Sequence, residues 1–130
     1  MKLAVWGWGV GILLGAMSVS HAMGYSAEYL NCMSQTQDST AQAALCMKAE
    51  LKQQTKRYEY FADIHVKALA KEKRKEQEKV NKNWLTFRDE QCLINNVKLS
   101  VGHASKYYFC AMKKTQAQAD LLEKQAYKYR

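Results

Sequence analysis

The chain has 130 residues, no proline and six glycines, and its formal net charge is +8. Four of the glycines lie in the first fifteen residues, and residues 25–101 contain none. This composition argues against β-sandwiches, barrels, Rossmann domains and P-loop enzymes, which need glycine- or proline-bearing turns or glycine-rich phosphate loops. We therefore expect an all-α protein, and the length fits one domain.

Residues 1–22 are typical of a secretory signal peptide. Lys2 provides the positive start, an uncharged and mostly apolar stretch of about 15 residues follows, and Ser20 and Ala22 are small residues suited to signal peptidase. The stretch is shorter than the ~20 residues of a membrane-spanning helix, so an uncleaved anchor is the less favoured alternative. Cleavage near Ala22 leaves residues 23–130 as a single periplasmic or secreted helical domain without a transmembrane segment.

Helix signals follow one another from residue 25 onward. A short helix is expected over residues 25–34, and a longer one begins near Asp38 or Ser39, which are favoured N-cap residues. Its apolar face follows a spacing of three and four residues, with Gln54 as a polar interruption. The positions on this face are Ala44, Met47, Leu51, Tyr58, Phe61, His65 and Ala68.

The segment from residue 39 to residue 99 needs a bend, because an unbroken helix of that length is ~90 Å long. Asn81–Asn83 is the expected place for a kink or break. The apolar spacing then resumes, and a last helix begins around residues 103–105 and continues to the C-terminus. The apolar positions of these segments are Val80, Trp84, Phe87, Ile94, Val97 and Val101, then Tyr108, Met112, Ala119, Leu122, Ala126 and Tyr129.

All four cysteines follow residue 22, and an even number in a short exported chain indicates disulfides. In an antiparallel helical hairpin, residues equidistant from the turn face each other. The midpoint of Cys32 and Cys46 is residue 39, among N-cap residues, and the midpoint of Cys92 and Cys110 is residue 101, beside Gly102. The spacing therefore favours these sequential pairs, each worth ~3 kcal/mol, in a disulfide-stapled bundle with long helices and helix–turn–helix corners. Crossed pairing is the alternative, and zinc is disfavoured because no CxxC pair is present.

The strongest charge run is residues 71–82, with six basic and three acidic side chains. Such a run is typical of a solvated helix segment. The functional alternative is a docking strip for an anionic partner such as lipopolysaccharide, peptidoglycan or an acidic protein. Nucleic acid is not expected as a partner, because export separates the protein from it and no nucleic-acid-binding motif is present. The basic residues of this strip are Lys71, Lys73, Arg74, Lys75, Lys79 and Lys82.

No catalytic, metal or cofactor site is recognisable in the sequence. His65 lies on an apolar helix face, where a buried structural histidine is more common than a catalytic one, and His103 lies at an expected helix start. The GxSxG, HExxH, EF-hand and CxxCH patterns are absent, and disulfide-bonded cysteines are not nucleophiles. We therefore expect a protein that is not an enzyme and that has no cofactor.

One dense group of side chains follows the charge run. Trp84, Arg88 and Cys92 are four residues apart, so they share one side of a helix, and Asp89 adjoins them. Arg88 is expected to stack on the indole of Trp84, and Arg88 and Asp89 to bond neighbouring helices. A structural lock beside the disulfide is the favoured interpretation, and a partner-binding surface is the alternative.

These residues also carry a resemblance to a known family. Residues 84–92, W-L-T-F-R-D-E-Q-C, and the pattern after them are similar to the C-terminal half of the lysozyme inhibitor LprI-like N-terminal domain family. That family comprises small exported bacterial helical proteins with paired cysteines, so the resemblance implies a helical fold in which Cys32 and Cys46 are the N-terminal pair. Its signature residues correspond to Trp84, Arg88, Asp89 and Cys92, and the rest of the pattern is Gly102, Tyr107, Tyr108, Cys110, Thr115, Leu121 and Leu122.

We therefore expect an exported, non-catalytic binding protein. The resemblance implies a lysozyme-inhibitor-like protein that occludes a muramidase by surface contact. The alternative is an envelope-associated structural or binding module whose basic helix contacts anionic lipopolysaccharide or peptidoglycan. Charge bears on this choice, because animal lysozymes are also basic and the long-range field between two basic proteins is repulsive.

Overall fold

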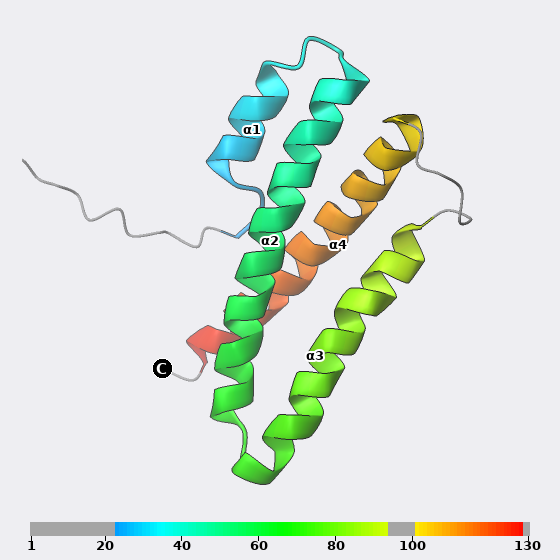
Figure 1. Ribbon diagram of the computed structural model, residues 1–130. Helices are drawn as coiled ribbons and strands as arrows, with labels where there is room; N and C mark the ends of the chain where they lie inside the picture. The colour runs from blue at the N-terminus through cyan, green and yellow to red at the C-terminus, as the bar shows by residue number, and fades with distance from the viewer. Residues whose placement is uncertain (1–22, 94–100, 129–130) are drawn as a thin grey trace, which may run out of the picture.

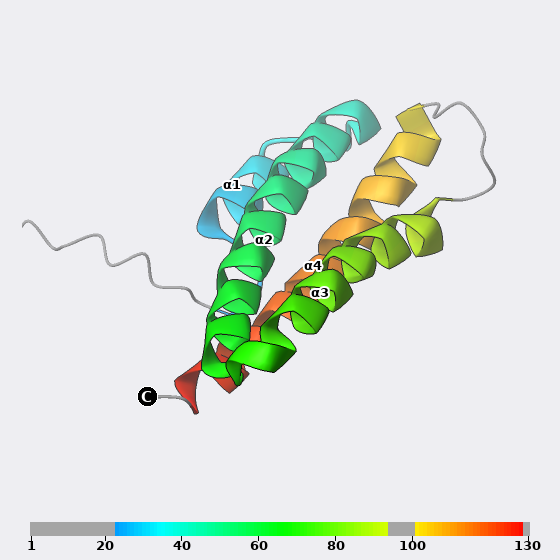
Figure 2. The same cartoon turned by 60° about the horizontal axis from the view of Figure 1, so that its bottom comes forward.

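The computed structural model describes residues 23–93 and 101–128, which form four α-helices and no strand. They are α1 (Ala27–Ser34), α2 (Thr40–Ala68), α3 (Lys71–Cys92) and α4 (Val101–Tyr127). In Figures 1 and 2, α2 and α4 run in the same direction and cross, α3 runs opposite to both, and α1 folds back along the first half of α2. The expected all-α, disulfide-stapled fold is confirmed. The predicted signal peptide, like Ile94, Val97 and Tyr129, lies outside the described residues.

The first corner joins α1 to α2 without a glycine. Gln37 and Asp38 have φ angles of 45° and 63°, in the left-handed region that reverses the chain after a helix. Ser39 then caps α2, because its hydroxyl accepts a hydrogen bond of 3.2 Å from the N–H of Gln42. This corner lets Cys32 and Cys46 bond, with their Cα atoms 5.7 Å apart. The N-cap at Ser39 agrees with the sequence prediction.

The hydrophobic core lies mainly between α2 and α4. Small alanines alternate with larger side chains, which allows the two helices to pack closely at their crossing. The ring of Trp84 and the side chains of Ile64 and Leu85 cover the edge of this core. Full burial of a side chain such as Phe61 contributes ~2 kcal/mol. The buried residues of the cluster are Tyr58, Phe61, Ala62, Ala119, Leu122 and Ala126.

Gln54, the polar interruption of the apolar face of α2, lies on the inward side of the helix with that face, and its side chain is buried. Its amide donates a 3.0 Å hydrogen bond to the carbonyl of Gly24, so burial leaves this donor satisfied. Glu50, one turn earlier, is only 2 % exposed and also belongs to the inward face. By contrast, Ala68 at the end of the helix is exposed, and His65 is half-buried rather than buried.

The helical rod breaks at Leu69 and Ala70, not at Asn81–Asn83 as the sequence suggested. The guanidinium of Arg74 donates hydrogen bonds of 3.0 and 3.2 Å to the carbonyls of Leu69 and Lys67, which satisfies the end of α2 without a glycine. Asn81 instead fits inside α3: its side-chain oxygen accepts from Gln77 at 3.0 Å. Asparagine disfavours the interior of a helix, but this hydrogen bond from Gln77 stabilises Asn81 within α3.

The inward face of α3 also differs from the predicted apolar stripe. Val80 and Phe87 are 52 % and 51 % exposed, whereas Arg88 and Cys92 are buried. The polar contacts of Arg88 with α2 and α4 fix the rotation of the helix, and the two apolar residues consequently face outward. Gly102, expected at a turn, lies in the first turn of α4, so α4 begins earlier than predicted and the connection precedes it.

Candidate functional site

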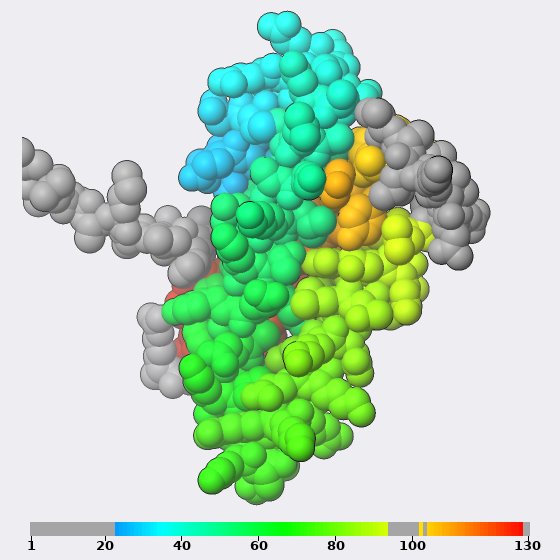
Figure 3. All heavy atoms as spheres, in the orientation of Figure 1, coloured from blue at the N-terminus to red at the C-terminus, as the bar shows by residue number. Residues whose placement is uncertain are grey.

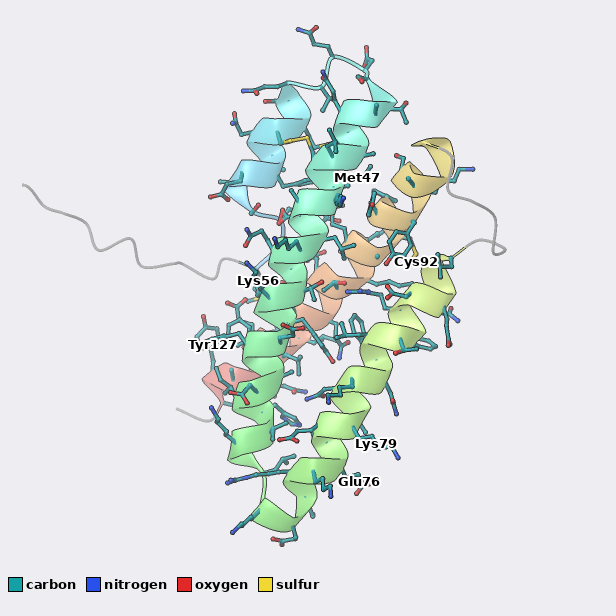
Figure 4. The ribbon with its side chains drawn as sticks, in the orientation of Figure 1. Met47, Lys56, Glu76, Lys79, Cys92 and Tyr127 are labelled. Carbon is teal, nitrogen blue, oxygen red and sulfur yellow. A yellow bond between two sulfur atoms is a disulfide. The ribbon has the colours of Figure 1, made fainter. Side chains whose placement is uncertain are left out.

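The signature residues Trp84, Arg88, Asp89 and Cys92 lie where α3 meets α2 and α4. The indole of Trp84 stacks on the ring of Tyr58, with centroids 4.7 Å apart and planes inclined by 29°. Tyr58, and not Arg88, is thus the stacking partner at this indole. Cys92 is joined to Cys110 of α4, with Cα atoms 5.5 Å apart, and Figure 4 shows Cys92 at the upper end of α3. The two disulfides are the sequential pairs that the spacing favoured.

Arg88 connects three helices through one buried guanidinium. Its Nη1 donates to the hydroxyl oxygens of Thr55 on α2 and Thr115 on α4, at 3.1 and 3.2 Å. Each threonine hydroxyl donates its own proton to the carbonyl one turn earlier, which leaves a lone pair for the arginine. Arg88 also bonds Asp89, at 3.0 Å. This geometry supports the interpretation of the group as a structural lock.

We predict that Arg88→Met lowers the free energy of unfolding by about 2 kcal/mol, because charge-assisted hydrogen bonds to two helices are lost. Lys82→Met, at an exposed position of the same helix, is the control and is expected to change it by less than ~0.5 kcal/mol. Urea unfolding followed by the fluorescence of Trp84 measures both, since Trp84 is the only tryptophan after residue 22. Equal stability of the two variants would contradict the lock.

Asp89 completes the lock by accepting a 2.7 Å hydrogen bond from the hydroxyl of Tyr107 on α4. Burial, followed by this hydrogen bond and the charge of Asp89, raises the pKa of Tyr107 to about 12. Burial also raises the pKa of Tyr58 to about 12. Tyr58 donates to the carbonyl of Asn81 at 2.9 Å, so both phenols act as proton donors between helices.

These two pKa values predict that stability falls between about pH 10 and about pH 12. In that window the unfolded tyrosines, with pKa values near 10, have lost protons that the folded state still holds. The unfolded state therefore binds fewer protons, and the free energy of unfolding decreases as the pH rises. Urea titrations across this range check the slope, and Tyr107→Phe is expected to reduce it. A slope unchanged by that substitution would contradict the assignment.

A second polar cluster, which the sequence reasoning missed, lies on the other side of the α2–α4 crossing. Arg57 forms ion pairs with Asp120 and with Glu123, the latter at 2.6 Å, and its Nη1 donates to Gln54 at 2.9 Å. Burial lowers the pKa of Arg57, but the hydrogen bonds and charges of the two carboxylates outweigh this and raise it. Glu50 accepts hydrogen bonds from the backbone N–H and the hydroxyl of Ser26, at 2.9 and 2.8 Å. The cluster thus ties the segment before α1 to the bundle.

The sequence does contain a weak signal for this cluster. Glu50, Gln54 and Arg57 recur at steps of four and three on α2, and Asp120 and Glu123 are three residues apart on α4. Charged residues at that spacing normally indicate a solvated face. A buried ion cluster differs from a solvated face in that the facing charges on the two helices have opposite signs. This is apparent only once α2 is known to pack against α4, which a single sequence does not show.

The basic strip of residues 71–82 begins at the corner where α2 turns into α3 and covers about the first half of α3, in the green lower part of the molecule in Figure 3. Arg74 is half-buried and its guanidinium bonds a carbonyl at the end of α2, so it is not one of the exposed cations of the strip. Figure 4 shows Lys79 on the flank of α3 opposite the side of the molecule that carries Lys56. The lysines of the strip, all exposed, are Lys71, Lys73, Lys75, Lys79 and Lys82.

In the described ranges, 23–93 and 101–128, no three His, Cys, Asp or Glu side chains are grouped so that they would hold a metal ion. None of the helices there is both long and apolar enough to cross a bilayer. The arrangement thus offers two buried polar junctions and one exposed basic strip. Comparison with family models, with curated proteins and with solved structures found no match to this chain.

Proposed function

We propose that the protein is exported, is cleaved after Ala22 and acts by binding, without catalysis, to an anionic component of the bacterial envelope. The two disulfides support an oxidising compartment. The observation that carries the proposed binding is a row of exposed lysines on one side of α3. Lys71, Lys75 and Lys79 are four residues apart, and Lys82 follows after three.

This lysine row suits an extended polyanion. Lys71 and Lys82 are eleven positions apart in the helix, so the charges of the row are distributed over ~16 Å at intervals of ~5–6 Å. Within the described residues, the side-chain ammonium groups of these four lysines form no hydrogen bond or ion pair. Phosphate groups of lipopolysaccharide and carboxylates of peptidoglycan both offer repeated negative charges. Attraction of this kind is screened by salt, which gives the binding a recognisable signature.

Lysozyme inhibition, which the family resemblance implies, receives less support from the geometry. The residues that carry the resemblance, Trp84, Arg88 and Cys92, take part in contacts between helices, so they contribute to the fold and do not form a surface for a partner. The exposed basic strip has the same sign of charge as a basic muramidase. The resemblance therefore bears more on the architecture than on the partner.

Cosedimentation of the processed protein with peptidoglycan sacculi and with lipopolysaccharide vesicles tests this proposal. We expect binding at low salt that weakens at high salt, and an affinity about tenfold lower when Lys71, Lys75 and Lys79 are changed to glutamine. Changing Lys48, Lys52 and Lys56 to glutamine is the matched control, because these exposed α2 lysines have the same spacing and charge. Equal losses in both variants would contradict a role for α3, and stoichiometric slowing of cell-wall lysis would favour the inhibitor instead.

A further inference from the structure

Gly24 lies at the centre of a closed set of polar contacts. Its N–H donates to Asp120 at 3.2 Å, and its carbonyl accepts from Gln54 at 3.0 Å. Gln54 and Asp120 are in turn both bonded by Arg57, which closes the ring. The φ angle of Gly24 is +93°, a conformation that glycine adopts readily and that directs its two polar groups toward different helices. The backbone next to residue 23 is therefore fixed against the bundle.

The acidic groups in this region outnumber the cations that contact them. Glu50, Asp120 and Glu123 are three carboxylates, and within the described part of the chain Arg57 pairs with Asp120 and Glu123, while Glu50 is bonded by Ser26 and by no cation. Glu123 is fully buried, and its Oε1 has no hydrogen-bond partner among the described atoms. Burial raises the pKa of Tyr25, and the nearby charges of Glu50 and Asp120 raise it further. The cluster consequently favours an additional positive charge beside it.

The backbone nitrogen of Met23 lies within reach of this cluster. Successive residues are ~3.8 Å apart, so this nitrogen is within about 7 Å of the Asp120 carboxylate that accepts from Gly24. Met23 is 49 % exposed, which leaves its backbone room to approach Asp120 more closely. In the uncleaved chain this nitrogen is a neutral amide. After cleavage before Met23 it is the α-amino group, which is protonated at neutral pH.

We propose that removal of the signal peptide creates the missing cation, and that the α-ammonium group of Met23 binds Asp120 and locks the fold. This inference rests on the proposed cleavage after Ala22. Water hydrolyses the Ala22–Met23 peptide bond in the signal-peptidase reaction, residues 1–22 leave with a terminal carboxylate, and the amine of Met23 takes up a proton. Processing thus strengthens the contact between the start of the mature chain, α2 and α4.

The test moves the ammonium group and leaves the rest of the chain intact. Two glycines inserted between Met23 and Gly24 extend the backbone by up to ~7 Å beyond the ring of contacts, and the full chain is expressed with its signal and exported. Mass spectrometry of the purified product identifies its first residue. We expect the insertion to raise the unfolding equilibrium constant about fivefold in the wild type and by much less in Asp120→Asn. Equal effects in both backgrounds, or no effect, would overturn the inference.

A second measurement does not depend on the stability of the Asp120→Asn variant. Reductive methylation with ¹³C labels the α-amine and the lysine amines without removing their charge, and NMR distinguishes the α-amine because it titrates at lower pH than the lysines. The ion pair predicts a pKa of the Met23 amine above its ordinary range of ~7.7–8.0, and a value within or below that range would contradict it. A product that does not begin at Met23 overturns the proposed cleavage together with this inference. A product that does begin there, with an ordinary amine, overturns this inference alone.

Discussion

Replacing Arg57 by alanine is expected to lower the free energy of unfolding by about 3–5 kcal/mol, because it leaves a buried carboxylate without its cation. The side chain of Glu123 is fully buried, and that of Asp120 is 22 % exposed. Without the guanidinium, both carboxylates lose their ion pair, and Gln54 loses a hydrogen bond. The buried carboxylate of Glu123 is then left without its cation in the α2–α4 crossing. This raises the free energy of the folded state but not that of the unfolded chain, in which the carboxylate is hydrated.

Lys67→Ala is the matched control for Arg57→Ala. Lys67 also forms an ion pair on α2, with Asp63 at 2.7 Å, but the two side chains are 72 % and 59 % exposed. Water screens such a pair, so its loss is expected to change stability by less than ~0.5 kcal/mol. Urea unfolding with fluorescence detection measures both variants. A loss below ~1 kcal/mol for Arg57→Ala would show that the cluster is solvated in solution.

The second large effect is expected from removal of the Cys92–Cys110 disulfide. Changing both cysteines to alanine should lower the free energy of unfolding by about 3 kcal/mol, since the bond closes a loop with a sequence separation of 18. Cys92 is 2 % exposed and follows Arg88 by one turn. Without the staple, the end of α3 and the start of α4 are held mainly by Arg88 and by the contact between Asp89 and Tyr107.

The other disulfide serves as the comparison. The loop between Cys32 and Cys46 has a separation of 14, so chain entropy predicts a similar loss of about 3 kcal/mol. The two variants should nevertheless differ in what unfolds locally. Loss of the first staple is expected to expose amides of α1 to hydrogen exchange, and loss of the second those at the α3–α4 junction. Indistinguishable exchange patterns would contradict this division.

Much of the helical architecture can be predicted from spacing alone. The sequential pairs Cys32–Cys46 and Cys92–Cys110 were predicted correctly, because each joins two helices that follow one another in the chain. The assumed equidistance from a corner does not hold for the second pair, since Cys92 is the last residue of α3 whereas Cys110 lies nine residues after the start of α4, and Gly102 is helical. Likewise, Ser39 starts α2 through its own side chain, a local effect that a sequence shows directly.

The features that the sequence could not reveal depend on side-chain hydrogen bonds that join one helix to another helix or segment. The end of α2 at Leu69 is stabilised by Arg74, which looks in sequence like one more charge in a solvated run. Gln54 appears to interrupt an apolar face until Gly24, thirty residues earlier, accepts its hydrogen bond. Likewise, Arg88 turns α3 so that Val80 and Phe87 face outward. In each case, a side-chain hydrogen bond determines a helix end or a buried face that the pattern of apolar residues alone would place elsewhere.

NMR titration of the processed protein with solubilised peptidoglycan fragments and with lipopolysaccharide shows whether the α3 lysine row binds an anionic envelope component. We expect the largest salt-sensitive shifts of backbone amides to fall within residues 71–82, while the amides of residues 48–56 on α2 change little. Shifts centred on α2 or α4, shifts that ignore salt, or none with either ligand would contradict it.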